Sequence, residues 1–171
     1  MRIIAGEWGG RRLAAPAGRT TRPTTDRARE AWMSIIAPAL LDARVLDLFA
    51  GSGALGLEAL SRGAAEATFV EDDPRALAAL RKNVAAFGCA DRVHIVRGDA
   101  IKFVRTLDPG RFDVAFCDPP YERGLATAVA QRWLDGAFAR ILGVEHSPRE
   151  PLPGSDDTRR YGDTAITFYR D

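Results

Sequence analysis

From residue 44 onward, short apolar runs alternate with longer segments in which leucine and alanine recur every three or four residues. The short runs are rich in Val, Ile and Phe, as strands covered on both faces are, and they occupy 44–49, 67–71, 93–97, 113–117 and 140–145. The longer segments have helical spacing and occupy 54–62, 74–87, 100–107 and 125–135. Strands that alternate with helices predict an α/β fold with a mostly parallel sheet.

The two ends of the chain depart from this alternation. Residues 2–14 have the pattern of a short hairpin, and a helix is expected from about residue 25 to 37, with Thr24 as its N-cap and Pro38 as its stop. Near the other end, apolar and polar residues alternate around Gly162-Asp163, which predicts an antiparallel hairpin at one edge of the sheet. The segment 147–158 is rich in Pro, Gly, Ser and Asp, so we expect a loop there.

Composition adds few constraints beyond a single domain. The chain has 171 residues, of which 46% are hydrophobic and 27% charged, which is ordinary globular usage and argues against disorder. The longest apolar stretch, 31–41, is broken by Ser34 and Pro38, and no signal peptide is recognisable, so we expect no membrane helix and a cytoplasmic protein. Cys89 and Cys117 lack the spacing of metal ligands, and neither they nor the two histidines are given a chemical role.

Positive charge is concentrated at the start of the chain although the net charge is only +1. Residues 1–30 hold three acids and seven arginines, which are Arg2, Arg11, Arg12, Arg19, Arg22, Arg27 and Arg29. Such a segment is either a docking surface for a polyanion or a solvated basic face, and charge alone leaves both interpretations open.

The segment 45–56 indicates a ligand site at the carboxyl end of the first strand of the sheet. Asp47 lies inside the strand, and Phe49, Gly51 and Gly53 form the turn into the next helix, where glycines let the backbone approach a ligand. Nicotinamide dehydrogenases use a similar turn, but a nearby carboxylate would repel the pyrophosphate of their cofactor. A carboxylate attracts a sulfonium ligand that also carries an amino group, so Asp47 favours S-adenosylmethionine.

Two further acids follow strands on the same sheet edge. Glu71 ends the second strand, where an acid can bind both ribose hydroxyls of a nucleotide. Asp99, with Ala100 after it, can accept a hydrogen bond from an adenine amine, but capping of the next helix is an equally good interpretation. We interpret Asp72 and Asp73, which precede Pro74, as helix caps.

The tetrapeptide 118–121 carries the predicted catalytic chemistry. The exocyclic amine of a base is a poor nucleophile because its lone pair is delocalised, and hydrogen-bond acceptors on its N–H groups would localise that pair. The Asp118 carboxylate and the carbonyl of Pro119 can be these acceptors, with Pro119 and Pro120 fixing the backbone. Tyr121 offers a ring on which an extruded base can stack. The alternative is a purely structural proline turn with a capping aspartate. The position of the tetrapeptide directly after the fourth strand, at the edge that holds the cofactor turn, makes this alternative weaker.

Four blocks, Arg2–Leu13, Arg22–Glu30, Asp47–Glu58 and Asp118–Tyr121, resemble those of the bacterial small-subunit ribosomal RNA guanine-N2 methyltransferases known as RsmD. The resemblance implies a Rossmann-like, seven-stranded fold, S-adenosylmethionine as donor and a guanine of 16S ribosomal RNA as acceptor, free or in an assembling small subunit. It implies an RNA-facing extension, residues 1–40, and a catalytic domain, residues 41–171, with no obligate protein partner. The residues expected to contact RNA are Arg2, Arg11, Arg12, Arg22, Thr24, Arg27 and Arg29. The segment from about residue 135 to 160 is shorter than the resemblance leads us to expect.

Three alternatives remain at this stage. An adenine-N6 or cytosine-N4 methyltransferase acting on DNA would share residues 118–121, although no target-recognition domain is visible. A non-catalytic RNA-binding assembly factor would have no need of Asp47 and Asp118. A nicotinamide dehydrogenase would have no use for the tetrapeptide.

Overall fold

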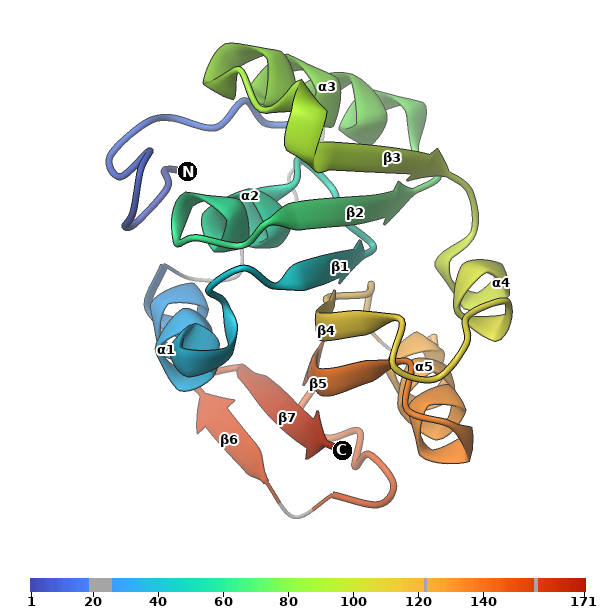
Figure 1. Cartoon of the computed structure of the whole chain (residues 1–171). Coiled ribbons are helices and arrows are strands. Elements are labelled where there is room, and N and C mark those ends of the chain that lie inside the picture. The colour runs from blue at the N-terminus through green and yellow to red at the C-terminus, as the bar shows by residue number, and fades with distance from the viewer. Residues whose placement is uncertain (19–25, 122, 156) are drawn as a thin grey trace.

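The computed structural model describes residues 1–18, 26–121, 123–155 and 157–171, which form a seven-stranded sheet with helices on both faces (Figure 1). The strands are β1 Arg44–Leu48, β2 Glu66–Glu71, β3 Val93–Arg97, β4 Phe112–Cys117, β5 Ala139–His146, β6 Thr158–Tyr161 and β7 Thr164–Arg170. Their order is β3-β2-β1-β4-β5-β7-β6, in which the first five are parallel and β7 and β6 each run antiparallel to the preceding neighbour.

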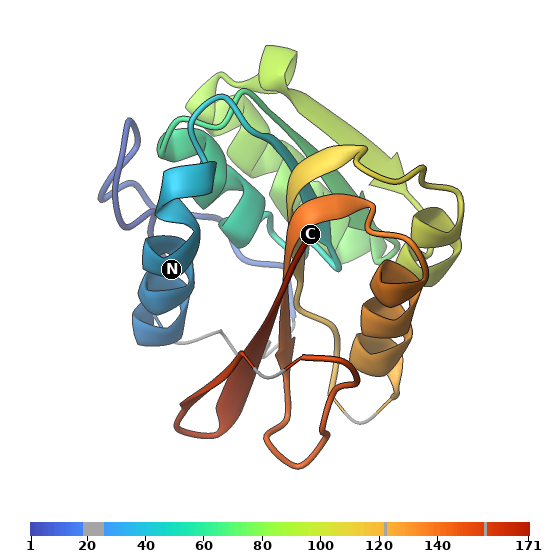
Figure 2. The ribbon, with the colours of Figure 1, turned by 60° about the horizontal axis from the view of Figure 1, so that its bottom comes forward.

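The helices form the two outer layers of a three-layer fold (Figure 2). They are α1 Asp26–Ile36, α2 Ala54–Ser61, α3 Pro74–Phe87, α4 Ala100–Arg105 and α5 Leu125–Asp135, with short 3-10 turns at Ala37–Ala39 and Ala90–Arg92. Helices α1, α2 and α3 pack on one face of the sheet, around Phe69 and Phe116, and α4 and α5 pack on the other, around Leu142. Burial on both faces explains why the central strands read as nearly continuous apolar runs.

Most element predictions are confirmed to within a residue or two. Helices α3 and α5 have the expected bounds, α4 ends at Arg105 instead of residue 107, and the C-terminal hairpin turns at residues 162–163 as expected. The N-cap of α3 is Asp73, whose side chain accepts hydrogen bonds from the backbone N–H of Arg75 at 2.8 Å and of Ala76 at 3.4 Å. Asp72 lies one residue outside that cap. The expected N-cap Thr24 lies outside the described residues, and no described helix is long and apolar enough to cross a membrane.

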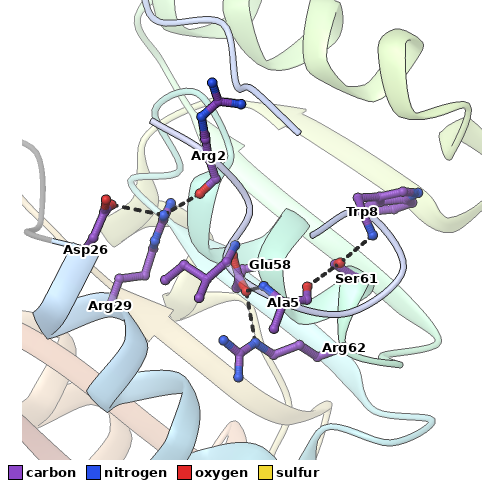
Figure 3. Close-up of polar contacts among 9 residues, drawn as sticks. Arg2, Ala5, Trp8, Asp26, Arg29, Glu58, Ser61 and Arg62 are labelled. Atoms are coloured by element: carbon purple, nitrogen blue, oxygen red, sulfur yellow. Dashed lines mark hydrogen bonds and ion pairs between the residues drawn. The ribbon is translucent and has the colours of Figure 1, made fainter. Parts of the chain in front are cut away.

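The expected N-terminal hairpin is present as one antiparallel bridge, between Arg2 and Arg12, together with main-chain hydrogen bonds that join residues 1–3 to residues 10–13, and the segment is also held by α2 (Figure 3). The buried Glu58 carboxylate accepts the N–H groups of Ile4 at 2.8 Å and Ala5 at 3.1 Å. The Ser61 hydroxyl accepts the N–H of Trp8 at 3.0 Å and donates to the carbonyl of Ala5 at 2.7 Å. These contacts convert the first residues of the chain into part of the layer that covers the sheet.

Side-chain packing fixes the same segment. Ile3, Trp8 and Leu13 are buried in the core that also contains α2 and α3, and the Trp8 ring stacks on Phe87 with 5.0 Å between centroids. At Gly6 the backbone has φ +86°, and an added Cβ would lie 1.9 Å from the carbonyl oxygen of Ser61. Glycine is therefore required both for the conformation and for the close approach to α2.

Candidate cofactor and catalytic site

A cavity of about 740 Å³ opens where β1, β2, β3, β4 and β5 end, on the side at which parallel sheets bind ligands. Its walls come from the turn after β1, the residues that follow β2 and β3, the tetrapeptide after β4, and the end of β5. The volume is typical of a small-molecule or cofactor site. The structure therefore gathers the predicted residues Asp47, Glu71, Asp99 and Asp118 around one space.

The turn after β1 presents bare backbone to this cavity. Phe49, Gly51 and Gly53 all have positive φ, at 58°, 58° and 87°. A Cβ on Gly51 would meet nothing within 4 Å, whereas one on Gly53 would come within 2.5 Å of the Leu80 side chain. The left-handed conformation costs a non-glycine residue about 1–3 kcal/mol, and such strain is concentrated at ligand sites. Phe49 is therefore a strained residue that lines the cavity, and its role in ligand binding stays a prediction.

Asp47 is a buried carboxylate in the wall of the cavity, with 1% of its surface exposed. Its Oδ2 accepts the backbone N–H of Gly56 at 2.9 Å. Only glycine fits at position 56, because a Cβ there would lie 2.4 Å from the Phe69 ring. Burial raises the pKa of Asp47 well above its usual value, the Gly56 hydrogen bond opposes this, and Asp118 and Glu71 add to the rise. A cationic ligand beside this carboxylate would relieve that destabilisation, so the wall suits a sulfonium or ammonium group.

Glu71 connects the end of β2 to the turn after β1. Its Oε2 accepts the N–H of Gly51 at 2.7 Å, and its Oε1 accepts the N–H groups of Asp72 and Asp73, both at 2.9 Å. The local sequence pattern did not indicate these contacts, which hold the carboxylate at the cavity. Asp99 caps α4 by accepting the N–H of Lys102 at 2.8 Å and also lines the cavity with Ala100, so the capping interpretation is confirmed and ligand binding stays a prediction.

The tetrapeptide 118–121 lies directly beyond β4 and lines the cavity with all four residues. Tyr121 is fixed by a contact that the sequence did not reveal. Its hydroxyl lies 2.5 Å from Thr164 Oγ1 and 3.3 Å from Glu145 Oε1, and the Thr164 hydroxyl donates to the same Glu145 oxygen at 2.9 Å. Glu145, 4% exposed at the end of β5, also lines the cavity. The sequence could have indicated Glu145, because a lone acid within an apolar strand is unusual.

The cysteines and histidines stay outside this chemistry. Cys117 is buried in the core beneath α4 and α5, where burial raises its pKa well above the ordinary value of a thiol. His146 is buried, with its Nε2 2.7 Å from the Thr167 hydroxyl and its Nδ1 2.9 Å from the carbonyl of Ser147. His94 is exposed on β3 beside Glu66. Among the described residues, no group of three or more His, Cys, Asp or Glu side chains is placed to bind a metal ion.

The N-terminal residues predicted to contact RNA divide into three groups. Arg2, Arg11, Arg12 and Arg27 are exposed, as the polyanion interpretation requires. Arg22 and Thr24 lie outside the described residues. The prediction that Arg29 contacts RNA is wrong, because its side chain is only 1% exposed and cannot reach RNA phosphates at the surface. It lies three and four positions before Trp32 and Met33, on the apolar face of α1 that packs on the sheet.

The residues around the cavity suit the chemistry of S-adenosylmethionine. A buried acid for a cation, an acid after the second strand and a glycine turn surround a single cavity with the Asp118–Tyr121 segment. This cavity and the seven-stranded sheet are those of the S-adenosylmethionine-dependent methyltransferase fold.

Within that class the chain belongs to the family described as "Conserved hypothetical protein 95", whose model matches residues 1–170. It is 46% identical over 156 residues to the ribosomal RNA small subunit methyltransferase D of Escherichia coli K12, covering 90% of this chain and 78% of the relative. A hypothetical protein of Thermus thermophilus superposes with a TM-score of 0.85 and 32% identity, over 100% of this chain and 99% of that one.

A more distant structure shares the fold. The RNA methyltransferase of Salinibacter ruber, solved in complex with S-adenosyl-L-homocysteine, has a TM-score of 0.67 and 16% identity, over 86% of this chain and 92% of its own. The segment 135–160, which is shorter than the resemblance leads us to expect, still forms the fifth strand of the fold. Strand β5 pairs with both β4 and β7.

Proposed function

We propose that this protein methylates the exocyclic N2 amine of a guanine in 16S ribosomal RNA, with S-adenosylmethionine as donor. The observation that carries the proposal is the meeting of Asp47, its glycine turn and the Asp118–Tyr121 segment at one cavity. The similarity to a small-subunit ribosomal RNA methyltransferase supports the choice of RNA. Guanine N2 is chosen because the four sequence blocks resemble those of guanine-N2 methyltransferases.

The cofactor is assigned to the wall formed by β1, β2 and β3. Asp47 faces its cationic amino-acid end, Glu71 its ribose hydroxyls, and Asp99 with Ala100 its adenine, while Phe49, Gly51 and Gly53 supply main-chain contacts. When bound, S-adenosylmethionine supplies a methyl group made electrophilic by the sulfonium. The protein contributes by excluding water and by orienting the methyl toward the tetrapeptide, which reduces the entropic cost of the reaction.

The target amine is assigned to the tetrapeptide. The Asp118 carboxylate and the carbonyl of Pro119 would accept its two N–H groups and so localise the nitrogen lone pair for attack on the methyl carbon. The methyl–sulfur bond would break as the nitrogen–carbon bond forms, so that S-adenosylhomocysteine leaves and the amine gives up one proton. Pro119 and Pro120 restrict φ and keep that carbonyl in place. The Tyr121 hydroxyl, held by Thr164 and Glu145, fixes a ring against which the extruded base stacks.

The substrate assignment is tested on ribosomal RNA from cells with and without the gene. The RNA is digested to nucleosides and compared by mass spectrometry, with cells carrying the Asp118→Ala variant as the matched control. We expect loss of N2-methylguanosine in the deletion, restoration by the wild-type gene and no restoration by the variant. Unchanged N2-methylguanosine with loss of N6-methyladenosine or N4-methylcytosine would replace guanine by one of the alternative bases.

Residues 1–40 are proposed as the RNA-facing extension of a catalytic domain that spans 41–171. Because Arg29 is buried, the exposed Arg2, Arg11, Arg12 and Arg27 are the arginines assigned to RNA phosphates, and Arg11, Arg12 and Arg27 are the three chosen for replacement. Each phosphate contact releases counterions when it forms, so it contributes to the dependence of RNA affinity on salt. The replacement of all three by alanine should weaken RNA binding and reduce the slope of log affinity against log salt by about 2–3.

The matched control removes two arginines from the other end of the sheet. Arg111 and Arg140 are exposed beside the starts of β4 and β5, away from the cavity. Arg111→Ala/Arg140→Ala should leave the salt slope near that of the wild type. Filter binding or fluorescence anisotropy at several salt concentrations measures both variants. Equal slopes in all three proteins would assign the N-terminal arginines to a solvated face.

A further inference from the structure

Asn83 is a buried side chain of α3 that connects two segments lying far apart in the sequence. It is 2% exposed, and its Oδ1 accepts the backbone N–H of Ala14 at 2.7 Å. Its Nδ2 donates to the main-chain carbonyls of Ala14 at 3.1 Å and of Ser52 at 2.9 Å. A buried amide costs free energy unless it is paired, so these bonds explain how a polar side chain can lie inside this layer.

Ser52 belongs to the glycine turn after β1 and lines the cofactor cavity. It lies between Gly51 and Gly53, which both have positive φ. Because glycine has no Cβ to restrict its backbone, the peptide groups of such a turn need outside contacts to keep one orientation. Asn83 supplies one of these contacts, since it binds the carbonyl of Ser52.

The peptide between Ser52 and Gly53 is held from both sides. The C=O and N–H of a trans peptide point in opposite directions; this carbonyl accepts from Asn83, and the N–H donates to the carbonyl of Ala50 at 2.8 Å. In the part of the chain that the structure describes, no hydrogen bond uses the neighbouring peptide, between Gly51 and Ser52. The contacts of the turn therefore leave that group available to a ligand.

Helix α3 supports the turn with an apolar contact as well as a polar one. Leu80 and Asn83 are three positions apart and share one face of the helix. A Cβ on Gly53 would come within 2.5 Å of the Leu80 side chain, so the turn lies directly on this face. Asn83 thus fixes the orientation of a backbone that Leu80 already contacts.

Ala14 brings the N-terminal segment, residues 1–18, into the same network. Asn83 binds both its N–H and its carbonyl, and Figure 1 shows the blue start of the chain passing beside α3. Pro16, two residues further on, lines the cavity. Arg12, two residues before, is exposed and is assigned to RNA. One side chain therefore connects the segment proposed to face RNA with the turn proposed to face the cofactor.

We propose that Asn83 is a positioning residue for cofactor binding, which holds the peptide between Ser52 and Gly53 in the orientation that the ligand requires and joins it to the N-terminal segment. This inference rests on the proposed function, because it takes S-adenosylmethionine as the ligand of the cavity. Asn83 does not line the cavity and acts through the turn. Its loss should therefore weaken cofactor binding and leave the chemical step intact.

The test replaces Asn83 by leucine, which has a similar size and makes none of the three hydrogen bonds. Calorimetry measures the dissociation constant of S-adenosylhomocysteine, and steady-state methyl transfer to RNA gives kcat and the KM for S-adenosylmethionine. Both constants should rise by about 3- to 10-fold, the range for the loss of a neutral hydrogen bond. At saturating cofactor, kcat should stay within about twofold of the wild type, because Asp118 and Tyr121 are untouched.

Two further variants separate positioning from a general loss of stability. Asn83→Ala removes the amide without adding apolar bulk beside the carbonyls, should show the same rise in KM, and carries the test if the leucine variant does not fold. Ser61→Ala weakens the attachment of the N-terminal segment to α2 without touching the glycine turn, so it should lower the melting temperature and keep the wild-type affinity.

Three results would overturn the assignment. They are an unchanged affinity in both Asn83 variants, a fall in kcat with an unchanged KM, and an equal loss of affinity in Ser61→Ala, which would indicate general loosening of the fold. A wild-type protein that does not bind S-adenosylhomocysteine would refute the proposed function together with this inference. Binding by the wild type with unaltered affinity in both Asn83 variants would refute the inference alone.

Discussion

Replacement of Asp118 by alanine should slow methyl transfer to RNA by on the order of a hundred- to a thousandfold, while S-adenosylmethionine affinity stays near that of the wild type. Asp118 lines the cavity at the end of β4 and is assigned to the target amine, so its contribution is made mainly in the transition state. Single-turnover methylation measures the rate, and calorimetry measures cofactor affinity separately.

Asp118→Asn distinguishes two roles of this carboxylate. Its amide oxygen still accepts a hydrogen bond from the base amine but cannot take up a proton, so activity above that of the alanine variant indicates that accepting is the larger task. Equal inactivity of the two variants would make Asp118 a general base. Wild-type rates in Asp118→Ala would reduce residues 118–121 to a structural turn.

Replacement of Asp47 by asparagine should weaken S-adenosylmethionine binding by about 10- to 100-fold, the effect of losing a charged hydrogen-bond partner, and should stabilise the protein without cofactor. The amide oxygen can still accept the N–H of Gly56. The buried charge that burial disfavours is gone, so the free energy of unfolding at neutral pH should rise. Calorimetry and thermal unfolding measure the two effects.

The pH dependence of Asp47 gives a second signature. Its folded-state pKa is raised, so the folded protein binds more protons than the unfolded one, and stability should fall as pH rises from about 4 through the folded-state value. Wild-type cofactor affinity should fall in the opposite direction, as acid neutralises the carboxylate. Asp47→Asn should flatten both profiles. As the control, Asp72→Asn removes an exposed carboxylate from the same wall and should change neither. Unchanged cofactor affinity in Asp47→Asn would contradict its assignment to the cationic end of the ligand.

Local sequence patterns predicted the helices and strands of this fold, because the formation of each element depends mainly on residues that are close in sequence. The turn after β1 and the tetrapeptide after β4 could be placed at one cavity, since parallel strands end at the same edge. Contacts between distant segments could not be read in this way. Glu58 meets the chain 53 and 54 positions away, and Tyr121 meets Thr164 43 positions away. Nothing in the local pattern specifies these pairs.

Arg29 shows a different failure, because the signal was present. A count of charges treats all arginines of the segment alike, whereas helical periodicity separates them. Arg29 shares the apolar face of α1 with Trp32 and Met33, and Arg27 lies outside it and is exposed. Helical spacing was the information needed to distinguish a buried cation from a surface one.

The reversed direction of β7 has an evolutionary consequence. In a strand parallel to β5 the last residue would reach the cavity, but in β7 it is the first, Thr164, which contacts Tyr121. The position of Thr164 is set by six pairs between β5 and β7, from Ile141 with Arg170 to His146 with Ala165. The loop between β5 and β6 can therefore gain or lose residues without moving Thr164, and variation in chain length among relatives is expected to accumulate there.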